Sequence, residues 1–231
     1  MTKVPFTYNA DSFKVAIDCI IFGFDKQELK LLLVHRNMEP AKGQWSLMGG
    51  FLSQEESLND GAKRILFQLT GLEDIYLEQV YLFGDINRDP VERVISICYY
   101  ALIKLEDYDE ELGQSHDAHW FPIKARPELI FDHEQMVDAA LYRLRRRAGY
   151  QPIGFELLPE KFTMKQLLSL YEAIYDRDFD EGNFSKKMLS LGILFKTDEK
   201  LRGSSKKGSF LYSFDQAGYE SVREKGFRII G

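Results

Sequence analysis

A group of charged side chains follows two glycines in the segment 49–72. The segment holds two adjacent glutamates, an aspartate and an arginine: Glu55, Glu56, Asp60 and Arg64. Carboxylate oxygens are the hard ligands that magnesium requires in near-octahedral geometry. After the arginine, Gln68 offers one neutral amide oxygen, whereas Ile65 and Leu69 offer no ligand. The segment therefore begins like a magnesium site and does not continue as one.

The same segment resembles the Nudix box, G-x5-E-x7-R-E-U-x-E-E-x-G-U, in which U is a bulky apolar residue. Six positions match: Gly50, Glu56, Arg64, Leu66, Gly71 and Leu72. Ile65, Gln68 and Leu69 replace the three carboxylates that hold magnesium against a diphosphate in Nudix hydrolases. We therefore predict no catalytic residue, no metal site and no cofactor. Glu56 is expected either to pair with Arg64 or to remain a solvated charge.

Local signals place most of the box on one helix. Ser53 and Glu56 have the S-x-x-E spacing of a capping box, which predicts a helix start at this point. Gly71 is expected to end the helix. Apolar residues recur at helical spacing between these limits and predict one buried face: Leu58, Ala62, Ile65, Leu66 and Leu69.

The remaining candidates for catalysis form no recognised pattern. The four histidines are scattered along the chain: His35, His116, His119 and His133. The sequence contains no G-x-S-x-G elbow, P-loop or H-E-x-x-H motif, and no Cys/His cluster with zinc spacing. Cys19 and Cys98 both lie in apolar, strand-like runs, which predicts buried and reduced thiols.

Length and composition favour a two-domain globular protein. The chain has 231 residues, of which 45% are hydrophobic and 13% aromatic, enough for two cores. No run approaches the roughly 18 apolar residues of a membrane span. The N-terminal segment lacks the apolar stretch of a signal peptide. We therefore expect a cytoplasmic protein with no membrane partner.

The first 151 residues alternate between strand-like and helical patterns. A polar turn at 25–28 separates the first two apolar runs and predicts a hairpin. Residues 133–149 predict an amphipathic helix with a basic C-terminal end. The expected strands cover 15–24, 29–36, 74–85, 94–105 and 118–123.

The pattern changes at the segment 149–159, which contains two glycines and two prolines. Residues 162–176 and 183–194 predict two amphipathic helices, and Thr163 is the expected cap of the first one. The second helix is expected to bury Phe184, Met188, Leu189 and Leu191. Two short strands then flank a basic loop: 192–197 and 209–214. The order helix, turn, helix and wing is that of a winged helix-turn-helix.

Charge is distributed unevenly between the two halves. The whole chain has a net charge of −6. Residues 1–151 carry 17 basic and 24 acidic side chains (−7), and residues 152–231 carry 13 and 12 (+1). Within 183–207, seven basic residues face two acidic ones (+5). A phosphate backbone meets the local charge, so the acidic total does not exclude nucleic acid as a partner.

The basic residues of the second half are candidates for contacts with DNA, because recognition helices enter the major groove by their N-terminal residues. The predicted contacts are Asn183, Ser185, Lys186, Lys187, Arg202, Lys206 and Lys207. Lysine reaches guanine or a phosphate, and asparagine reads adenine. The run Arg145–Arg147 stays open between a favourable helix C-terminus, a dimer interface and DNA contact.

Polar residues within apolar strands, or at strand ends, are candidates for a small-molecule site. The predicted effector-binding residues are Asp18, Arg36, Asp85, Arg93 and His119. Asp18 lies inside an apolar strand and therefore needs a polar partner. Each of the five is equally open to a role in a buried ion pair or as an exposed charge. By resemblance to Nudix domains, the pocket is expected between the sheet and the box helix.

The degenerate box followed by a winged helix resembles the NrtR family of Nudix-related transcriptional regulators. Segments 119–123, 129–147 and 157–194 are similar to that family's linker helix and DNA-binding segment. The resemblance implies an α/β fold with an N-terminal Nudix-like sandwich and a mixed sheet, which binds the effector, and a C-terminal winged helix-turn-helix. We place these domains at 1–151 and 152–231. The resemblance also implies a homodimer that binds double-stranded operator DNA.

The family resemblance leaves the effector open between two branches. Some members sense ADP-ribose and control NAD metabolism, whereas the AraR-like branch senses sugars such as L-arabinose. Since ADP-ribose sensing is associated with a better preserved box, we favour a sugar here and keep ADP-ribose as the alternative. We expect a repressor released by its inducer, with an activator as the alternative. A Nudix hydrolase with a relocated metal site is the competing function, and Ile65, Gln68 and Leu69 argue against it.

Overall fold

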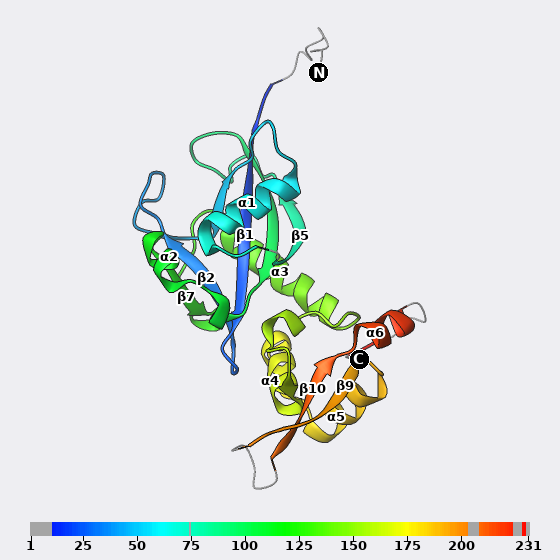
Figure 1. Cartoon of the computed structure of the whole chain (residues 1–231). Coiled ribbons are helices and arrows are strands. Elements are labelled where there is room, and N and C mark those ends of the chain that lie inside the picture. Colours follow the sequence, from blue (N-terminus) through cyan, green and yellow to red (C-terminus); the bar gives the residue numbers. More distant parts are fainter. Residues whose placement is uncertain (1–10, 74, 203–207, 224–227, 230–231) are drawn as a thin grey trace.

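The computed structural model describes residues 11–73, 75–202, 208–223 and 228–229. A mixed sheet forms the N-terminal half (Figure 1), in which β1 pairs parallel with β6 and antiparallel with β2 and β4. Its strands are β1 (Lys14–Phe24), β2 (Leu29–His35), β3 (Trp45–Ser46), β4 (Met48–Phe51), β5 (Tyr76–Phe83), β6 (Val94–Leu102) and β7 (Ala118–Pro122). The expected hairpin is confirmed as β1 and β2, and Asp25 accepts hydrogen bonds from the turn amides of Gln27 and Glu28.

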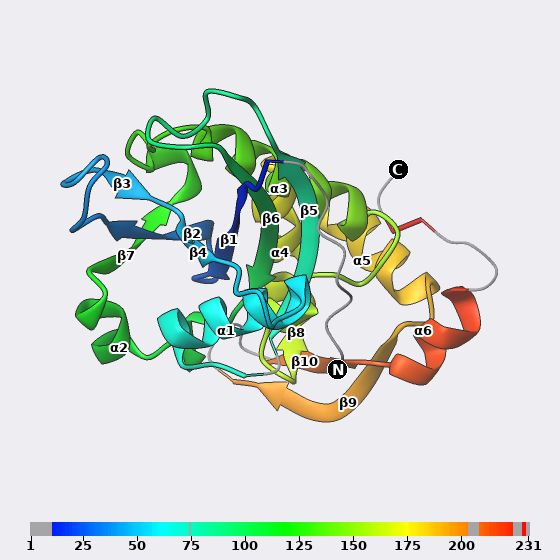
Figure 2. The same cartoon turned by 90° about the horizontal axis from the view of Figure 1, so that it is seen from above.

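Two helices cover opposite faces of this sheet, α1 (Leu58–Thr70) and α3 (His133–Ala148), as Figure 2 shows. Alternation along β1 supplies both cores, since Ile17, Cys19 and Ile21 join the core under α1 while Ile20 and Phe22 join the core under α3. The shorter helical pieces are α2 (Glu110–Ser115), η1 (Leu105–Asp107), η2 (Ile123–Ala125) and η3 (Phe155–Leu157). No helix in the described ranges is long and apolar enough to cross a membrane.

Both cysteines are buried with free thiols, as predicted. Burial raises the pKa of the Cys19 and Cys98 thiols. The two side chains belong to the two different cores, on opposite faces of the sheet. Each thiol therefore acts as a small apolar group of its core.

Helix α1 starts later than its sequence signal suggested. Its cap is Ser57, whose side chain accepts a hydrogen bond from the Asp60 amide at 3.2 Å. The Ser53 amide does donate to Glu56 at 2.7 Å, but this bond closes the loop before the helix. The capping box placed at Ser53 was therefore wrong as a helix start. Gly71 ends the helix as predicted, with φ of 69° and its amide bonded to Phe67 O at 2.8 Å.

The C-terminal half has the expected helix, turn, helix and wing. Its elements are β8 (Phe162–Thr163), α4 (Met164–Tyr175), α5 (Glu181–Ser190), β9 (Leu194–Leu201), β10 (Ser209–Phe214) and α6 (Gln216–Arg223). β10 pairs antiparallel with both β8 and β9, so the wing hairpin is anchored at the start of α4. Thr163 is the predicted cap of α4 and forms a full capping box with Gln166.

Helix α5 differs from its sequence prediction at both ends. It begins at Glu181 because Asp180 caps it, accepting a hydrogen bond from the Asn183 amide at 2.7 Å. Phe184 and Met188 are buried as predicted, but Leu189 is 51% exposed. The prediction for Leu189 was wrong because this residue follows Met188 by about 100° around the helix, beyond the contact with α4.

The two halves are joined where the last turns of α3 lie against α4. Arg145 Nε donates to the carbonyl oxygen of Ile174 at 2.8 Å, and the Tyr175 hydroxyl donates to the carbonyl oxygen of Arg145 at 2.8 Å. Arg147 binds Glu78 of β5 at 2.9 Å. Two of the three ambiguous arginines therefore hold elements of the fold together.

The capping box of α4 makes a testable contribution to stability. Replacing Thr163 with alanine removes the acceptor for the Gln166 amide, which lies 3.2 Å from the Thr163 hydroxyl. We expect Thr163→Ala to lower the free energy of unfolding by about 1 kcal/mol, measured by urea denaturation. Thr163→Ser keeps the hydroxyl and serves as the matched control. Equal stability of the alanine variant and the wild type would contradict the assignment.

Candidate functional site

The first half of the box is held by an ion pair between Glu56 and Arg64. Arg64 Nε lies 2.8 Å from Glu56 Oε2, and its Nη2 lies 2.6 Å from Glu56 Oε1. The same Nη2 donates to the Phe51 carbonyl oxygen at 3.1 Å, which fixes the loop after β4 on the helix. The bonds from Arg64 and the Ser53 amide lower the pKa of Glu56 to about 2. The predicted pairing is confirmed, and both carboxylate oxygens of Glu56 are bonded to Arg64.

The positions of the missing carboxylates have apolar or neutral surroundings. Ile65 is 2% exposed, and its Cδ1 lies 3.2 Å from where a Cβ on Gly50 would stand. Leu69 packs against the same core, and Gln68 accepts a bond from Arg64 at 3.4 Å. Within the described ranges, no group of three or more His, Cys, Asp or Glu could hold a metal ion. The box residues therefore do not fit magnesium.

The space between α1 and the sheet is filled by side chains. Ile17, Ala62, Leu66 and Tyr99 belong to one buried cluster there, and each is at most 3% exposed. Our expectation of a pocket beneath the box helix is therefore not met. Close-packed interiors have few voids larger than a water molecule. The polar side chains that the sequence picked out lie on the opposite face of the sheet or at its ends.

A buried charged cluster lies on the α3 face of the sheet. Asp18 is 8% exposed and accepts a bond from the Ser96 hydroxyl at 2.5 Å. Arg88 binds both carboxylate oxygens of Asp132, at 2.9 and 2.8 Å, and lies 3.7 Å from Asp18. Asp18 thus has the partners that its position in an apolar strand requires. The cluster ties the loop between β5 and β6 to the first residues of α3.

His133 completes this cluster as a neutral side chain. The Leu47 amide donates to His133 Nδ1 at 3.1 Å, so this nitrogen carries no proton. Nε2 lies 3.9 Å from Asp18 Oδ1. Burial is the main cause of the lowered pKa of His133, against the opposite pull of the Asp18 and Asp132 carboxylates. The ring is therefore uncharged near neutral pH and packs beside Asp18.

Three of the five predicted effector residues gather at the β5–β6 loop. A cavity of about 410 Å³ there is lined by Asp85, Arg88 and Asp132, and Asp18 lies behind it in the charged cluster. Arg93 donates to the carbonyl oxygens of Asp85 and Gly84 at 2.9 and 3.0 Å. Arg88 and Asp132 were not anticipated, although a buried Asp18 signals that such partners exist.

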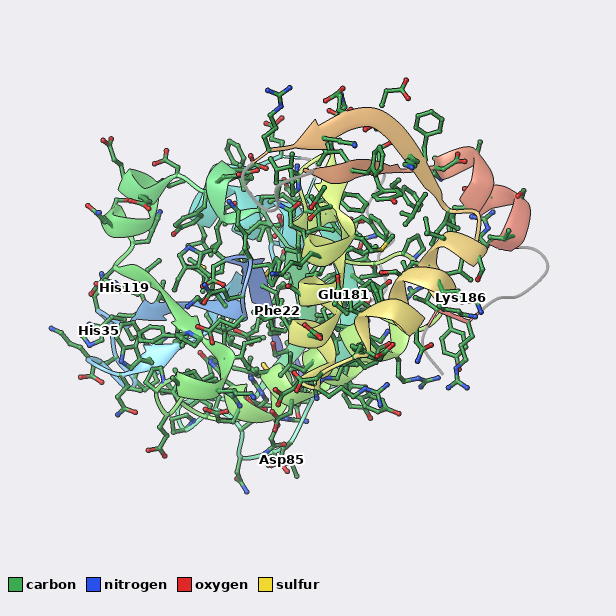
Figure 3. All side chains as sticks on the ribbon, turned by 90° about the horizontal axis from the view of Figure 1, so that it is seen from below. Phe22, His35, Asp85, His119, Glu181 and Lys186 are labelled. Carbon is green, nitrogen blue, oxygen red and sulfur yellow. The ribbon has the colours of Figure 1, made fainter. Side chains whose placement is uncertain are left out.

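The other two predicted effector residues lie apart from this loop. Arg36 Nε donates to the Pro40 carbonyl oxygen at 2.7 Å and stabilises its own loop. His119 lies on β7, far from Asp85 in Figure 3, and its Nε2 is 2.9 Å from Asp117. Asp117 also holds His35 at 3.1 Å. The two histidines and Asp117 form a separate exposed group beside Trp45.

The candidate nucleic-acid surface is formed by α5 and the wing. Lys186 points away from the protein in Figure 3. Asn183, Lys187 and Arg202 are also exposed, whereas Ser185 is half-buried. Lys206 and Lys207 lie outside the described residues. Two wing lysines were missed by the sequence reasoning: the ammonium groups of Lys196 and Lys200 lie 3.6 and 4.3 Å from the ring centre of Phe210.

Comparison with known proteins identifies the combination of these two parts. Residues 12–140 match the NUDIX domain, and residues 154–214 match the NrtR DNA-binding winged helix domain. The ADPR responsive transcriptional repressor NtrR of Acinetobacter baylyi is 32% identical over 211 residues, which cover 89% of this chain and 84% of that protein. The chain belongs to the NrtR family of Nudix-related transcriptional regulators.

Solved structures of this family have the same architecture. Shewanella oneidensis NrtR complexed with a 27mer DNA has a TM-score of 0.79 at 27% identity, covering 93% of this chain and 96% of that one. The same protein without DNA gives 0.77 at 28% identity, covering 87% and 93%. The α/β fold, a Nudix domain with a mixed sheet followed by a winged helix, is thereby confirmed. The sugar-sensing branch within the family is not shown.

The Glu56–Arg64 pair predicts a pH-dependent contribution to stability. Because the folded-state pKa of Glu56 lies below its ordinary value of 4.5, the pair stabilises the folded protein above pH 4.5. This contribution is lost as the pH falls toward 2. We expect Arg64→Gln to raise the pKa of Glu56 toward 4.5, measured by carboxyl ¹³C NMR titration. An unchanged Glu56 pKa in Arg64→Gln would contradict the assigned cause.

The buried cluster predicts a larger effect at Arg88. Arg88→Met leaves the Asp132 and Asp18 carboxylates without their cation, and we expect it to lower the free energy of unfolding by about 3–5 kcal/mol. The control is Arg93→Met, which removes two bonds to backbone carbonyls and the contact of the guanidinium with the Phe13 ring, and which should cost about 1 kcal/mol. Denaturant unfolding of the two variants measures the difference. Equal losses would mean that the Arg88 pair is no stronger than a loop contact.

Proposed function

We propose that this NrtR-family protein is a transcriptional repressor whose Nudix domain binds ADP-ribose without hydrolysing it. The main observation is that the box helix keeps the ion pair between Glu56 and Arg64, while Ile65, at the position of a metal-binding carboxylate, is buried in the core. The same chain also contains a winged helix. The ligand is carried over from the relative in Acinetobacter baylyi, which is described as ADPR responsive. A ligand that is bound and not cleaved does not require the metal carboxylates.

This proposal replaces the sugar effector that the degenerate box favoured. Similarity to the ADPR responsive repressor extends over 89% of this chain, including the DNA-binding half. The replacement of the three box carboxylates argues against hydrolysis, but it does not indicate which ligand the domain binds. We therefore prefer ADP-ribose and retain L-arabinose as an outcome of the test.

We further propose a division of labour between residues 1–151 and 152–231. The first part binds the effector, with Asp18, Asp85 and Arg93 at the β5–β6 loop as its candidate residues. The second part binds operator DNA through α5 and the wing, where Lys186, Lys187, Lys196 and Lys200 are exposed. We also propose a homodimer, because paired recognition helices match the two half-sites of an operator.

The contacts of α3 suggest how the two parts communicate. Its first residues are bound to the β5–β6 loop through Arg88 and Asp132, and its last turn is bound to α4 through Arg145 and Tyr175. A groove of about 500 Å³ lies beside this junction and is lined by residues of both α3 and α4. A ligand that binds one arrangement of loop and helix more tightly shifts the population toward that arrangement. In the proposed homodimeric repressor, the distance between the two recognition helices in that arrangement does not match the distance between the two half-sites of the operator.

The effector is tested by titration of the protein–DNA complex. The probe is a duplex that the wild-type protein enriches from a random library, followed by electrophoretic mobility shift. We expect ADP-ribose to weaken binding by about tenfold or more, a usual size for allosteric coupling, and L-arabinose to have no effect. Release by L-arabinose alone would restore the sugar hypothesis, and release by neither ligand would overturn effector sensing as stated.

Two controls separate this function from its competitors. Lys186→Ala combined with Lys187→Ala should abolish DNA binding while ADP-ribose binding, measured by calorimetry, is retained. Incubation of the wild type with ADP-ribose and magnesium should release no AMP or ribose phosphate. Clear turnover would support the hydrolase alternative, because bound ADP-ribose would then be a substrate.

A further inference from the structure

The outward face of α5 has a composition that the fold does not explain. Gly182, Lys186 and Leu189 follow one another at helical spacing and share one side of the helix. Phe184 and Met188 occupy the opposite side and are buried against the domain core. Figure 3 shows α5 at the surface with Lys186 directed outward. The three residues therefore face whatever the helix meets.

Gly182 has no internal reason to be glycine. Among the described residues, a Cβ added there would meet only Asp180 Oδ1 at 3.5 Å, an ordinary contact, and the residue is helical. Other glycines are required by the fold: Gly71 has a positive φ of 69°, and a Cβ on Gly113 would stand 2.1 Å from the Tyr108 hydroxyl. Glycine destabilises a helix relative to alanine. A glycine that the chain itself does not need points to a partner that approaches the backbone closely.

Leu189 and Lys186 indicate the chemical nature of the partner that approaches this face of α5. Leu189 is 51% exposed, whereas the other large apolar side chains of α5, Phe184 and Met188, are buried. Lys186 is exposed, and in the described part of the chain its side chain has no hydrogen-bond or ion-pair partner. The face therefore offers one unpaired cation and one apolar side chain a helical turn apart. Duplex DNA presents matching groups in its major groove, namely guanine acceptors and the 5-methyl group of thymine.

We propose that α5 lies in the major groove along the line of Gly182, Lys186 and Leu189. The absent side chain of Gly182 lets the first turn approach the DNA closely. Lys186 reaches guanine or a phosphate, and Leu189 packs on the methyl group of a thymine. This inference rests on the proposed DNA-binding function and assigns the residues that set approach distance and base preference. Gly182 and Leu189 act by shape, so basic charge alone does not reveal them.

The role of Gly182 is tested by opposing effects on stability and binding. Gly182→Ala should leave the melting temperature equal to or above that of the wild type, because alanine favours the helix. Its affinity for the duplex enriched by the wild type should fall at least tenfold, and Gly182→Leu should fall further. Lys63→Ala, an exposed change on α1, is the control and should bind normally. Wild-type affinity in both Gly182 variants would overturn the proposal.

The contact of Leu189 is tested by removing the thymine methyl groups. Each thymine of the enriched duplex is replaced in turn by deoxyuridine, which lacks only that methyl. The wild type should lose about fivefold in affinity at one thymine of each half-site, as expected for one buried methyl group. Leu189→Ala should bind more weakly but lose nothing further at that position.

The outcomes distinguish this inference from the function on which it rests. If no thymine methyl matters to the wild type, or if Leu189→Ala is equally sensitive to its loss, the assignment of Leu189 is overturned while DNA binding stands. If the wild type enriches no sequence and binds no duplex, the proposed function fails and the inference fails with it.

Discussion

The paired guanidinium and carboxylate of Arg88 and Asp132 link the parts of this protein that have to act together. Arg88 is buried and the Asp132 side chain is 12% exposed, and the bidentate bonds at 2.9 and 2.8 Å hold the β5–β6 loop on the start of α3. Removing either partner would leave an uncompensated buried charge. The other end of α3 is bound to α4 by Arg145 and Tyr175. One helix thus connects the loop of the Nudix domain with the helix that supports α5.

The Nudix box persists here as a structural device. Glu56 and Arg64 hold the loop after β4 against α1, and Gly50 leaves space for the buried Ile65. A glutamate at position 65 would bring a carboxylate into an apolar core, which is costly without a partner. The retained half of the motif therefore holds the loop and the helix together. In the other half, apolar residues replace carboxylates that could bind a metal.

Much of the candidate site could be predicted from the sequence. The residues that were missed or misplaced were so for physical reasons. The wing, the cap at Thr163 and the exposed Lys186 follow from local patterns, so they were predicted. Arg88 and Asp132 were missed because they are 44 residues apart and only folding brings them together. Leu189 was misplaced because helical periodicity gives the spacing of an apolar face but not its width. That width depends on how far α4 extends over α5.

The sequence by itself determined the order of elements, the two-part architecture and the loss of the three box carboxylates, because these depend on residue type and short-range spacing. Tertiary structure decided which polar groups meet. It buried Asp18 with Arg88 and His133, filled the space beneath α1 and left His119 with Asp117 at another edge of the sheet. It also left Gly182 and Leu189 uncovered on α5. Such features arise from packing between distant segments, which local sequence patterns do not encode.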